Sequence, residues 1–175
     1  MIYVGATRES PLHFYLMTLA LGIDPGTATT GYGLVRLTRD GNLESVAFGV
    51  ILTPAHTPAQ ERLLTLYREL KKLITLHHPE TCAVEKLFFQ RNVSTAIAVG
   101  QARGVVMLSI AEAGLDVAEY TPNEVKQAVA GYGSAQKKQV QEMVRVLLSL
   151  PEIPKPDDAA DALAIAITHL HTKRF

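Results

Sequence analysis

The chain contains 175 residues, of which 47% are hydrophobic, and its 17 Lys and Arg residues balance its 17 Asp and Glu residues. This length and composition exclude a disordered chain and are typical of one globular domain, whereas the balanced charge gives no sign of a nucleic-acid partner. The single Cys82 excludes an internal disulfide and favours a reducing compartment, so we expect a cytoplasmic protein.

Residues 1–18 carry no periodic pattern, and we expect them to form a flexible extension before a single domain at residues 19–172. The domain begins with the segment LALGIDPG, in which an apolar run ends at Asp24 and meets Pro25 and Gly26. Pro and Gly end a strand, so this pattern predicts a buried strand that holds the Asp24 carboxylate at its end. That place suits a metal ligand, although Asp before Pro-Gly is also ordinary turn chemistry.

Two further strands are predicted at residues 31–38 and 43–53, on either side of an Asp-Gly turn. With the first strand they would form an antiparallel meander. A helix is predicted at residues 58–77, where apolar residues recur every three or four positions after a capping box that starts at Thr57.

The rest of the chain alternates helices and strands. A short apolar strand at residues 81–85 ends, like the first strand, on a carboxylate. The later predicted elements are a long helix, a strand and three more helices, at residues 94–113, 116–120, 122–130, 135–148 and 157–171. This order predicts an α/β fold with a mixed five-stranded sheet, part antiparallel meander and part parallel, and helices on both faces.

Four carboxylates occupy notable places in this plan: Asp24, Glu85, Asp158 and Asp161. Asp158 and Asp161 are three residues apart on the last helix, where they would repel one another unless a cation compensates. Acids in a first turn also favour the helix dipole, and Asp157 or Asp158 could be the N-cap. Capping explains Asp161 less well, because Ala and Leu flank it on a helix that should be mostly buried.

Oxygen ligands without a Cys or His cluster suit Mg²⁺ or Mn²⁺. Two such ions roughly 3.5 to 4 Å apart can activate a water and stabilise the leaving oxygen of a phosphodiester, which favours a phosphoryl-transfer nuclease. Gly and Thr residues beside Asp24 also suit a nucleotide phosphate, as in sugar-kinase-like ATPases, although no Walker-type GxxxxGKS/T motif is present. His169 and His171 lie further along the last helix, and we expect them to be surface or packing residues.

Five blocks of the sequence, in this order and spacing, closely resemble the RuvC family of bacterial Holliday junction resolvases: ALGIDPGTATTGYGLV, VEKLF, GQARGV, EYTPNEVKQAVAGYGSAQKKQVQ and DDAADALAIAITH. The resemblance covers about residues 19–172 and implies a ribonuclease H-like fold. It implies that the four carboxylates are catalytic ligands of two Mg²⁺ ions per subunit, with Mn²⁺ as a substitute. The implied protein is a homodimeric endonuclease of recombination and repair that nicks four-way junction DNA symmetrically, with the RuvA–RuvB branch-migration complex as a partner.

The same resemblance implies that Lys126 and Lys137 contact the DNA backbone. It also implies that Phe88 stacks on a junction base. Residues 125–141 hold three lysines and no acid, which supports a local positive surface, although such a run is often only a solvated face. A ribonuclease H-like nuclease that acts on RNA and an ATPase of related fold remain alternatives.

The helix at residues 94–113 is apolar on nearly every side, and we expect it to contribute to the dimer interface. Small residues at four-residue intervals would permit close approach of a second backbone, and further apolar residues exceed what one sheet-facing stripe needs: Ala96, Gly100 and Gly104, then Val99, Val106 and Ile110. Burial wholly within one subunit is the alternative.

Overall fold

The computed structural model describes residues 17–54, 56–86 and 93–173. The first strand begins at Thr18, one residue before the predicted start of the domain. The rest of the predicted extension, apart from Met17, and the predicted stacking residue Phe88 lie outside the described residues.

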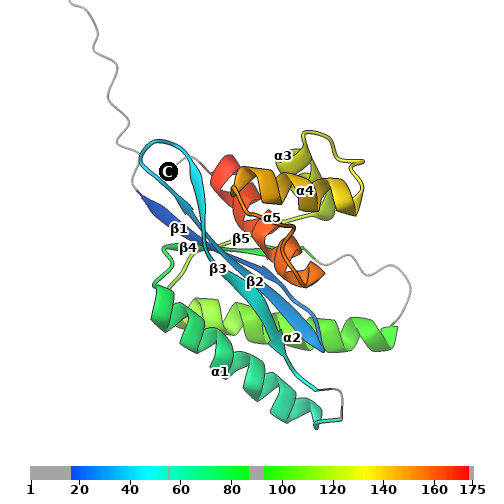
Figure 1. The fold of residues 1–175 in the computed structure, drawn as a ribbon. Helices are drawn as coiled ribbons and strands as arrows, with labels where there is room; N and C mark the ends of the chain where they lie inside the picture. Colours follow the sequence, from blue (N-terminus) through cyan, green and yellow to red (C-terminus); the bar gives the residue numbers. More distant parts are fainter. Residues whose placement is uncertain (1–16, 55, 87–92, 174–175) are drawn as a thin grey trace, which may run out of the picture.

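Five strands form one mixed sheet (Figure 1). They are β1 (Thr18–Asp24), β2 (Thr29–Leu37), β3 (Leu43–Leu52), β4 (Thr81–Glu85) and β5 (Val117–Tyr120), in the spatial order β3-β2-β1-β4-β5. The β1–β2 and β2–β3 pairs are antiparallel, whereas β4 runs parallel to both β1 and β5. The predicted meander and mixed sheet are confirmed.

Helices cover both faces of this sheet, as the alternating pattern predicts. The helices are α1 (Ala59–His77), α2 (Val93–Glu112), α3 (Pro122–Ala130), α4 (Lys137–Leu147) and α5 (Asp157–Thr172). Figure 1 shows α1 and α2 on one face and α3, α4 and α5 on the other. Each face has its own apolar core, one containing Ile23 and Val84 and the other Ala20 and Ala83, because successive strand residues point to opposite faces.

Two predicted helix starts have different outcomes. At α3 the predicted capping box is present, since the Thr121 hydroxyl accepts a hydrogen bond from the Glu124 N–H and the Glu124 carboxylate accepts one from the Thr121 N–H. At α1 the predicted box is wrong. Pro58 is the N-cap there and no side chain caps the helix, while the Thr57 N–H bonds back to the Pro54 carbonyl in a turn.

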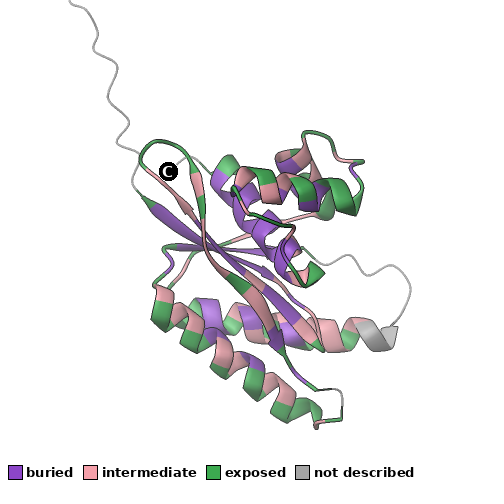
Figure 2. Cartoon of the chain, viewed as in Figure 1, coloured by how far each residue is buried: buried purple, intermediate pink, exposed green. Residues whose placement is uncertain are grey.

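Helix α5 lies unusually close to the sheet, and two glycines permit this. A Cβ atom at Gly31 would collide with the backbone of Asp158, and one at Gly22 would collide with the backbone of Ala162. The small residues of α5 complete the contact, and Figure 2 shows α5 among the most buried parts of the molecule. This close contact brings the start of α5 to the ends of β1 and β2. No helix in the described part of the chain is both long and apolar enough to cross a bilayer.

Candidate active site

Asp24 and Glu85 are the last residues of two neighbouring parallel strands, β1 and β4. The residues before them, Ile23 and Val84, pack into the core beneath α1 and α2. Strand alternation therefore turns the Asp24 and Glu85 side chains to the opposite face, the one that α5 covers. Apolar strands thus hold both carboxylates at one edge of the sheet.

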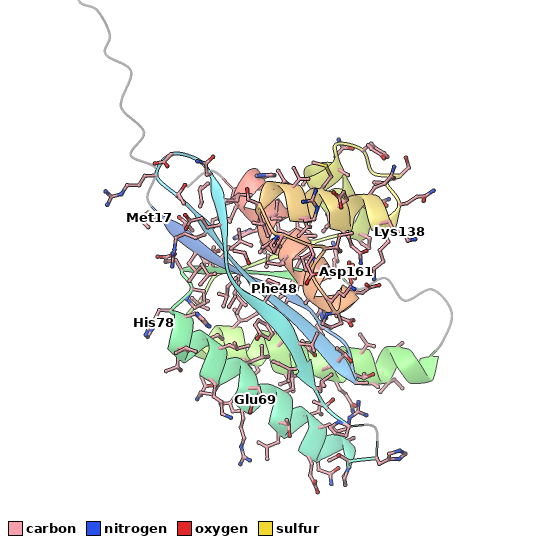
Figure 3. The ribbon with its side chains drawn as sticks, viewed as in Figure 1. Met17, Phe48, Glu69, His78, Lys138 and Asp161 are labelled. Atoms are coloured by element: carbon pink, nitrogen blue, oxygen red, sulfur yellow. The ribbon has the colours of Figure 1, made fainter. Side chains whose placement is uncertain are left out.

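Helix α5 supplies the other two predicted acids from above this edge. Asp158 lies directly over Gly31, the residue that pairs with Asp24 in the sheet. Asp161 follows one turn later and is about one third exposed. Figure 3 shows Asp161 on α5 beside the end of α4 that carries Lys138. Neither Asp157 nor Asp158 caps the helix, because α5 has no side-chain cap, so the capping alternative for these two residues is wrong.

The carboxyl groups are close enough to alter one another's ionisation. Burial, followed by the negative charges of Glu85, Asp161 and Asp158, raises the pKa of Asp24 to about 7. Burial and the charge of Asp161 raise the pKa of Glu85, although a hydrogen bond from the protonated Asp24 carboxyl opposes the rise. Burial also raises the pKa of Asp161. The structure therefore brings all four predicted acids into one cluster, which favours a bound cation.

Lys137 lies inside this cluster. Its Nζ atom is 2.9 Å from Asp161 Oδ2 and 3.2 Å from Asp157 Oδ2. Burial alone would lower the pKa of this lysine, but its hydrogen bonds to Asp161 and Asp157 outweigh burial and raise it. The predicted DNA-contact lysine is therefore an ion-pair partner of the acids in this structure.

A cavity of about 260 Å³ opens beside the cluster. Its polar lining comes from Glu85, Asp161, Lys126 and Lys137, so it joins two of the acids to both predicted DNA-contact lysines. Its remaining walls are mostly Val, Ile, Ala and Pro side chains. The cavity is thus acidic at one point and basic at another, an arrangement suited to a metal-bound phosphate.

The donor set fits a hard divalent cation, because it consists of carboxylate oxygens whose charges are poorly compensated. As the side chains stand, no three Asp, Glu, His or Cys residues among those described form a complete ligand group. The structure therefore provides the ligand type and the excess negative charge, whereas closing the ligand group requires the carboxylates to turn toward an ion.

The two histidines of α5 are separate from the acidic cluster, as predicted. His169 is buried, and its Nε2 and Nδ1 atoms lie 2.7 Å from the Thr81 hydroxyl and 2.9 Å from the Tyr120 hydroxyl. His171 lies on the exposed surface. His169 is therefore a packing residue that joins α5 to β4 and β5.

One residue beside the cluster has no counterpart in the sequence predictions. Arg103, on α2, donates a hydrogen bond to the main-chain carbonyl of Glu85. Its sequence signals are its place in the GQARGV block and its position as a cation in a long apolar helix, and neither signal indicates a contact with Glu85.

Comparison with known proteins shows which family the chain matches. A family model described as "Crossover junction endodeoxyribonuclease RuvC" matches residues 20–169. The chain is 62% identical over 155 residues to the protein of that name from Desulfitobacterium hafniense (strain DSM 10664 / DCB-2), covering 88% of this chain and 93% of that one. It is 59% identical over 153 residues to the one from Chloroflexus aurantiacus (strain ATCC 29366 / DSM 635 / J-10-fl), with coverage of 87% and 93%.

A solved structure of a RuvC protein agrees with this assignment, and a more distant one shares the fold. The structure described as "T. thermophilus RuvC in complex with Holliday junction substrate" matches with a TM-score of 0.81 and 37% identity, over 88% of this chain and 94% of that chain. The yeast mitochondrial Holliday junction resolvase Ydc2 shares the fold, with a TM-score of 0.64 at 16% identity, over 91% of this chain and 82% of that chain.

Proposed function

The chain belongs to the RuvC family of crossover junction endodeoxyribonucleases, and from this premise we propose that it resolves Holliday junctions in recombination and DNA repair. The reaction is hydrolysis of a phosphodiester bond by one nuclease domain at residues 19–172. The observation that carries the proposal is the cluster of four carboxylates from β1, β4 and α5 beside a cavity that two lysines also line. We also propose that the chain works in the cytoplasm, because its single cysteine, Cys82, is unpaired and buried, as is usual in a reducing compartment.

In this proposal the four acids hold divalent metal, namely two Mg²⁺ ions per subunit with Mn²⁺ as a substitute. When bound, such ions supply an activated water on one side of the phosphate and charge stabilisation of the leaving oxygen on the other. Asp24 and Glu85 have fixed main-chain positions because each ends a buried strand, while their carboxylates would turn toward an ion. Asp158 and Asp161 come from a helix that packs directly on the sheet, so their positions depend on that contact.

The lysines in this proposal hold the DNA backbone. Lys126 and Lys137 line the same cavity as Glu85 and Asp161, so a phosphate bound there would meet both lysines beside the acids. Lys137 would exchange its ion pairs with Asp157 and Asp161 for phosphate when metal and DNA bind. Phe88, in the segment after Glu85, is proposed to stack on a junction base.

The working unit in this proposal is a homodimer, because one active site hydrolyses one strand and a junction requires two paired cuts. The α2 interface needs a correction: Val106 and Ile110 are buried in the subunit core and are not available to a partner. The outward apolar side chains are Ile97 and Leu108, each 60% exposed. They are eleven residues apart, about three helical turns, so they lie on one face with Gly104 between them.

We also propose the RuvA–RuvB branch-migration complex as a partner, on family membership alone. Its presence is not needed for the basic test, which uses the purified chain.

That test compares cleavage of a synthetic four-way DNA junction with cleavage of duplex DNA, cleavage of an RNA substrate and hydrolysis of ATP. We expect paired nicks in the junction with Mg²⁺ or Mn²⁺ and little turnover of the other three substrates. Ca²⁺ should bind without efficient turnover, because its looser coordination misplaces the nucleophile. Preference for RNA or ATP would favour one of the alternative functions, and undiminished cleavage in excess chelator would reject the metal mechanism.

A further inference from the structure

Arg103 connects α2 to the ends of two strands. Its Nη1 atom donates a hydrogen bond of 2.7 Å to the main-chain carbonyl of Glu85, and its Nη2 atom lies 2.7 Å from Glu119 Oε2 on β5. The Arg103 side chain is only 16% exposed, so water competes weakly for these contacts. A guanidinium group presents several donors in one rigid plane, which lets it hold both oxygens at once.

These contacts act on the residue that carries a proposed metal ligand. The Glu85 side chain points toward α5, while its carbonyl is held from the α2 side of the sheet. The next residue is also held to β5, because the Lys86 N–H donates a 2.8 Å hydrogen bond to the Tyr120 carbonyl. Arg103 therefore anchors the last residue of β4.

Glu119 sets the direction of the guanidinium group. It pairs with Val84 in the β4–β5 register, so its side chain lies on the α2 face, one residue away from Glu85. The ion pair holds Arg103 over the junction of the two strands. Without Arg103, the Glu85 carbonyl would lose a charge-assisted hydrogen bond and Glu119 would lose its ion-pair partner.

We propose that Arg103 is a positioning residue for the cleavage reaction: by holding the main chain of Glu85, it keeps the Glu85 carboxylate in place to bind metal. The proposal rests on the proposed function, because it assumes that Glu85 is a metal ligand. Groups that orient metal ligands from outside the ligand shell commonly change metal affinity by about 10- to 100-fold when they are removed.

A matched control exists on α4. Arg145 also bonds a glutamate, Glu142, at 2.6 Å and a main-chain carbonyl, that of Leu150, at 3.4 Å. Its partners include none of the four acids and none of the residues that line the cavity beside them. Arg145→Met therefore removes a similar pair of contacts without disturbing Glu85.

The experiment measures three properties of the full chain in the wild type, Arg103→Met, Arg103→Lys and Arg145→Met. They are the Kd of Mn²⁺ for DNA-free protein by titration calorimetry, the kcat and KM for junction cleavage, and the Tm. We expect Arg103→Met to raise the Mn²⁺ Kd about tenfold or more and to lower kcat while KM stays unchanged. Arg103→Lys, which keeps the charge but lacks the planar fork, should fall between this variant and the wild type, and Arg145→Met should bind Mn²⁺ normally.

A wild-type Mn²⁺ Kd and kcat in folded Arg103→Met would overturn the proposal. If Arg103→Met lacks a cooperative melting transition, Arg103→Lys decides: a raised Kd supports the positioning role and a wild-type Kd overturns it. Asp24→Asn, measured in parallel, distinguishes failure of the Arg103 proposal from failure of the metal-site assignment. If that variant binds Mn²⁺ and cleaves normally, the assignment of the acids has failed, which is a different result from normal behaviour of the Arg103 variants alone.

Discussion

Asp157 and Asp161 lie four residues apart on α5, yet the protein treats their carboxyl groups in opposite ways. The hydrogen bond and the positive charge of Lys137 lower the pKa of the exposed Asp157. Burial raises the pKa of Asp161, although the same lysine contacts it. Two identical side chains on one helix thus differ in how easily they ionise. The negative charge of Asp161 is destabilised within the cluster, whereas the negative charge of Asp157 is solvated and paired.

This difference supplies a control for the site assignment. We expect Asp158→Asn and Glu85→Gln to bind junction DNA almost normally and to lose at least about 100-fold in cleavage, since each keeps its shape but loses an anionic ligand. Asp157→Asn should retain most of its activity. Gel-shift and cleavage assays on the same preparations decide between these outcomes, and normal cleavage by Asp158→Asn or Glu85→Gln would reject the assignment.

Lys126 contributes to the proposed DNA surface without an acidic partner in the cluster. Lys126→Ala should weaken junction binding and reduce the salt dependence of affinity by about one unit of slope, the effect of losing one phosphate contact. Lys72→Ala is the control, because Lys72 pairs with Glu69 on exposed α1. Filter binding at several salt concentrations measures the slope, and equal slopes for the Lys126 variant and the wild type would place Lys126 outside the DNA contact.

His169 links stability to pH. Burial, aided by the positive charge of Lys173, lowers the pKa of His169 from 6.5 to about 4. Between these values the unfolded chain binds a proton that the folded chain does not, so stability is full above pH 6.5 and falls as the pH drops toward 4. The loss should reach about 3 kcal/mol from this residue.

Urea unfolding from pH 7 to pH 4.5 measures the effect, with His169→Gln as the comparison. The variant should have lower stability at neutral pH and a flatter dependence on pH in this range. The charged residues Asp116 and Lys173, which line the same cavity as His169, are the same in the wild type and the variant. Parallel curves for the two proteins would show that His169 is protonated equally in the folded and unfolded states.

At the scale of elements, the contact between α5 and the sheet decides where two of the acids lie. Helix α5 contains almost entirely buried residues from Ala159 to Leu170 and packs against β1 and β2 across glycines. Small residues on both sides let the backbones approach closely. The helix can therefore present Asp158 and Asp161 within electrostatic reach of Asp24, which a larger side chain at the contact would prevent.

Gly31→Ala tests this contact. Its new methyl group would meet the Asp158 backbone, so we expect a loss of about 1 to 3 kcal/mol in stability from overpacking, together with reduced cleavage as Asp158 is displaced. Gly133→Ala is the control, since its nearest neighbour would be 3.6 Å away, an ordinary contact. Melting curves and cleavage rates for both variants are the measurements. A Gly31→Ala protein with wild-type stability and activity would show that α5 has room to move without effect.

At the scale of the whole molecule, the two faces of the sheet carry different surfaces. The α3–α5 face carries the acids and the cavity, whereas the α2 side exposes the apolar residues Ile97 and Leu108. These surfaces lie on opposite layers, as Figure 1 shows. A dimer formed through α2 would therefore leave both active sites open to DNA.

Leu108→Glu should convert the dimer to monomers, because a buried unpaired carboxylate at a tight interface is strongly unfavourable. Leu76→Glu, on α1, is the control at a position that is 72% exposed. Sedimentation of each protein gives the mass, and paired cleavage of the junction should be lost together with the dimer. A dimeric Leu108→Glu protein would move the interface away from α2, and a monomeric wild type that still makes both cuts would reject the dimer itself.

Local patterns were sufficient for most of the elements. Three of these patterns involve only residues close together in sequence: the apolar runs before Asp24 and Glu85, and the capping box at Thr121. All three are present in the structure. The failure at Thr57 has a local cause as well, since a competing turn with Pro54 uses the backbone that the box required. The sequence thereby determined the mixed sheet, its helices and, through five blocks in a characteristic order and spacing, the family that the chain resembles.

Only the tertiary structure decided how distant side chains meet. Lys137 and Asp161 are 24 residues apart and Arg103 and Glu85 are 18 apart, so no helix or strand period relates the members of either pair. Their contacts arise because α4 packs beside α5 and because α2 packs beneath β4. The raised pKa of Asp24 has the same origin: it depends on burial and on negative charges that β1, β4 and α5 bring together, and these exist only once the chain has folded.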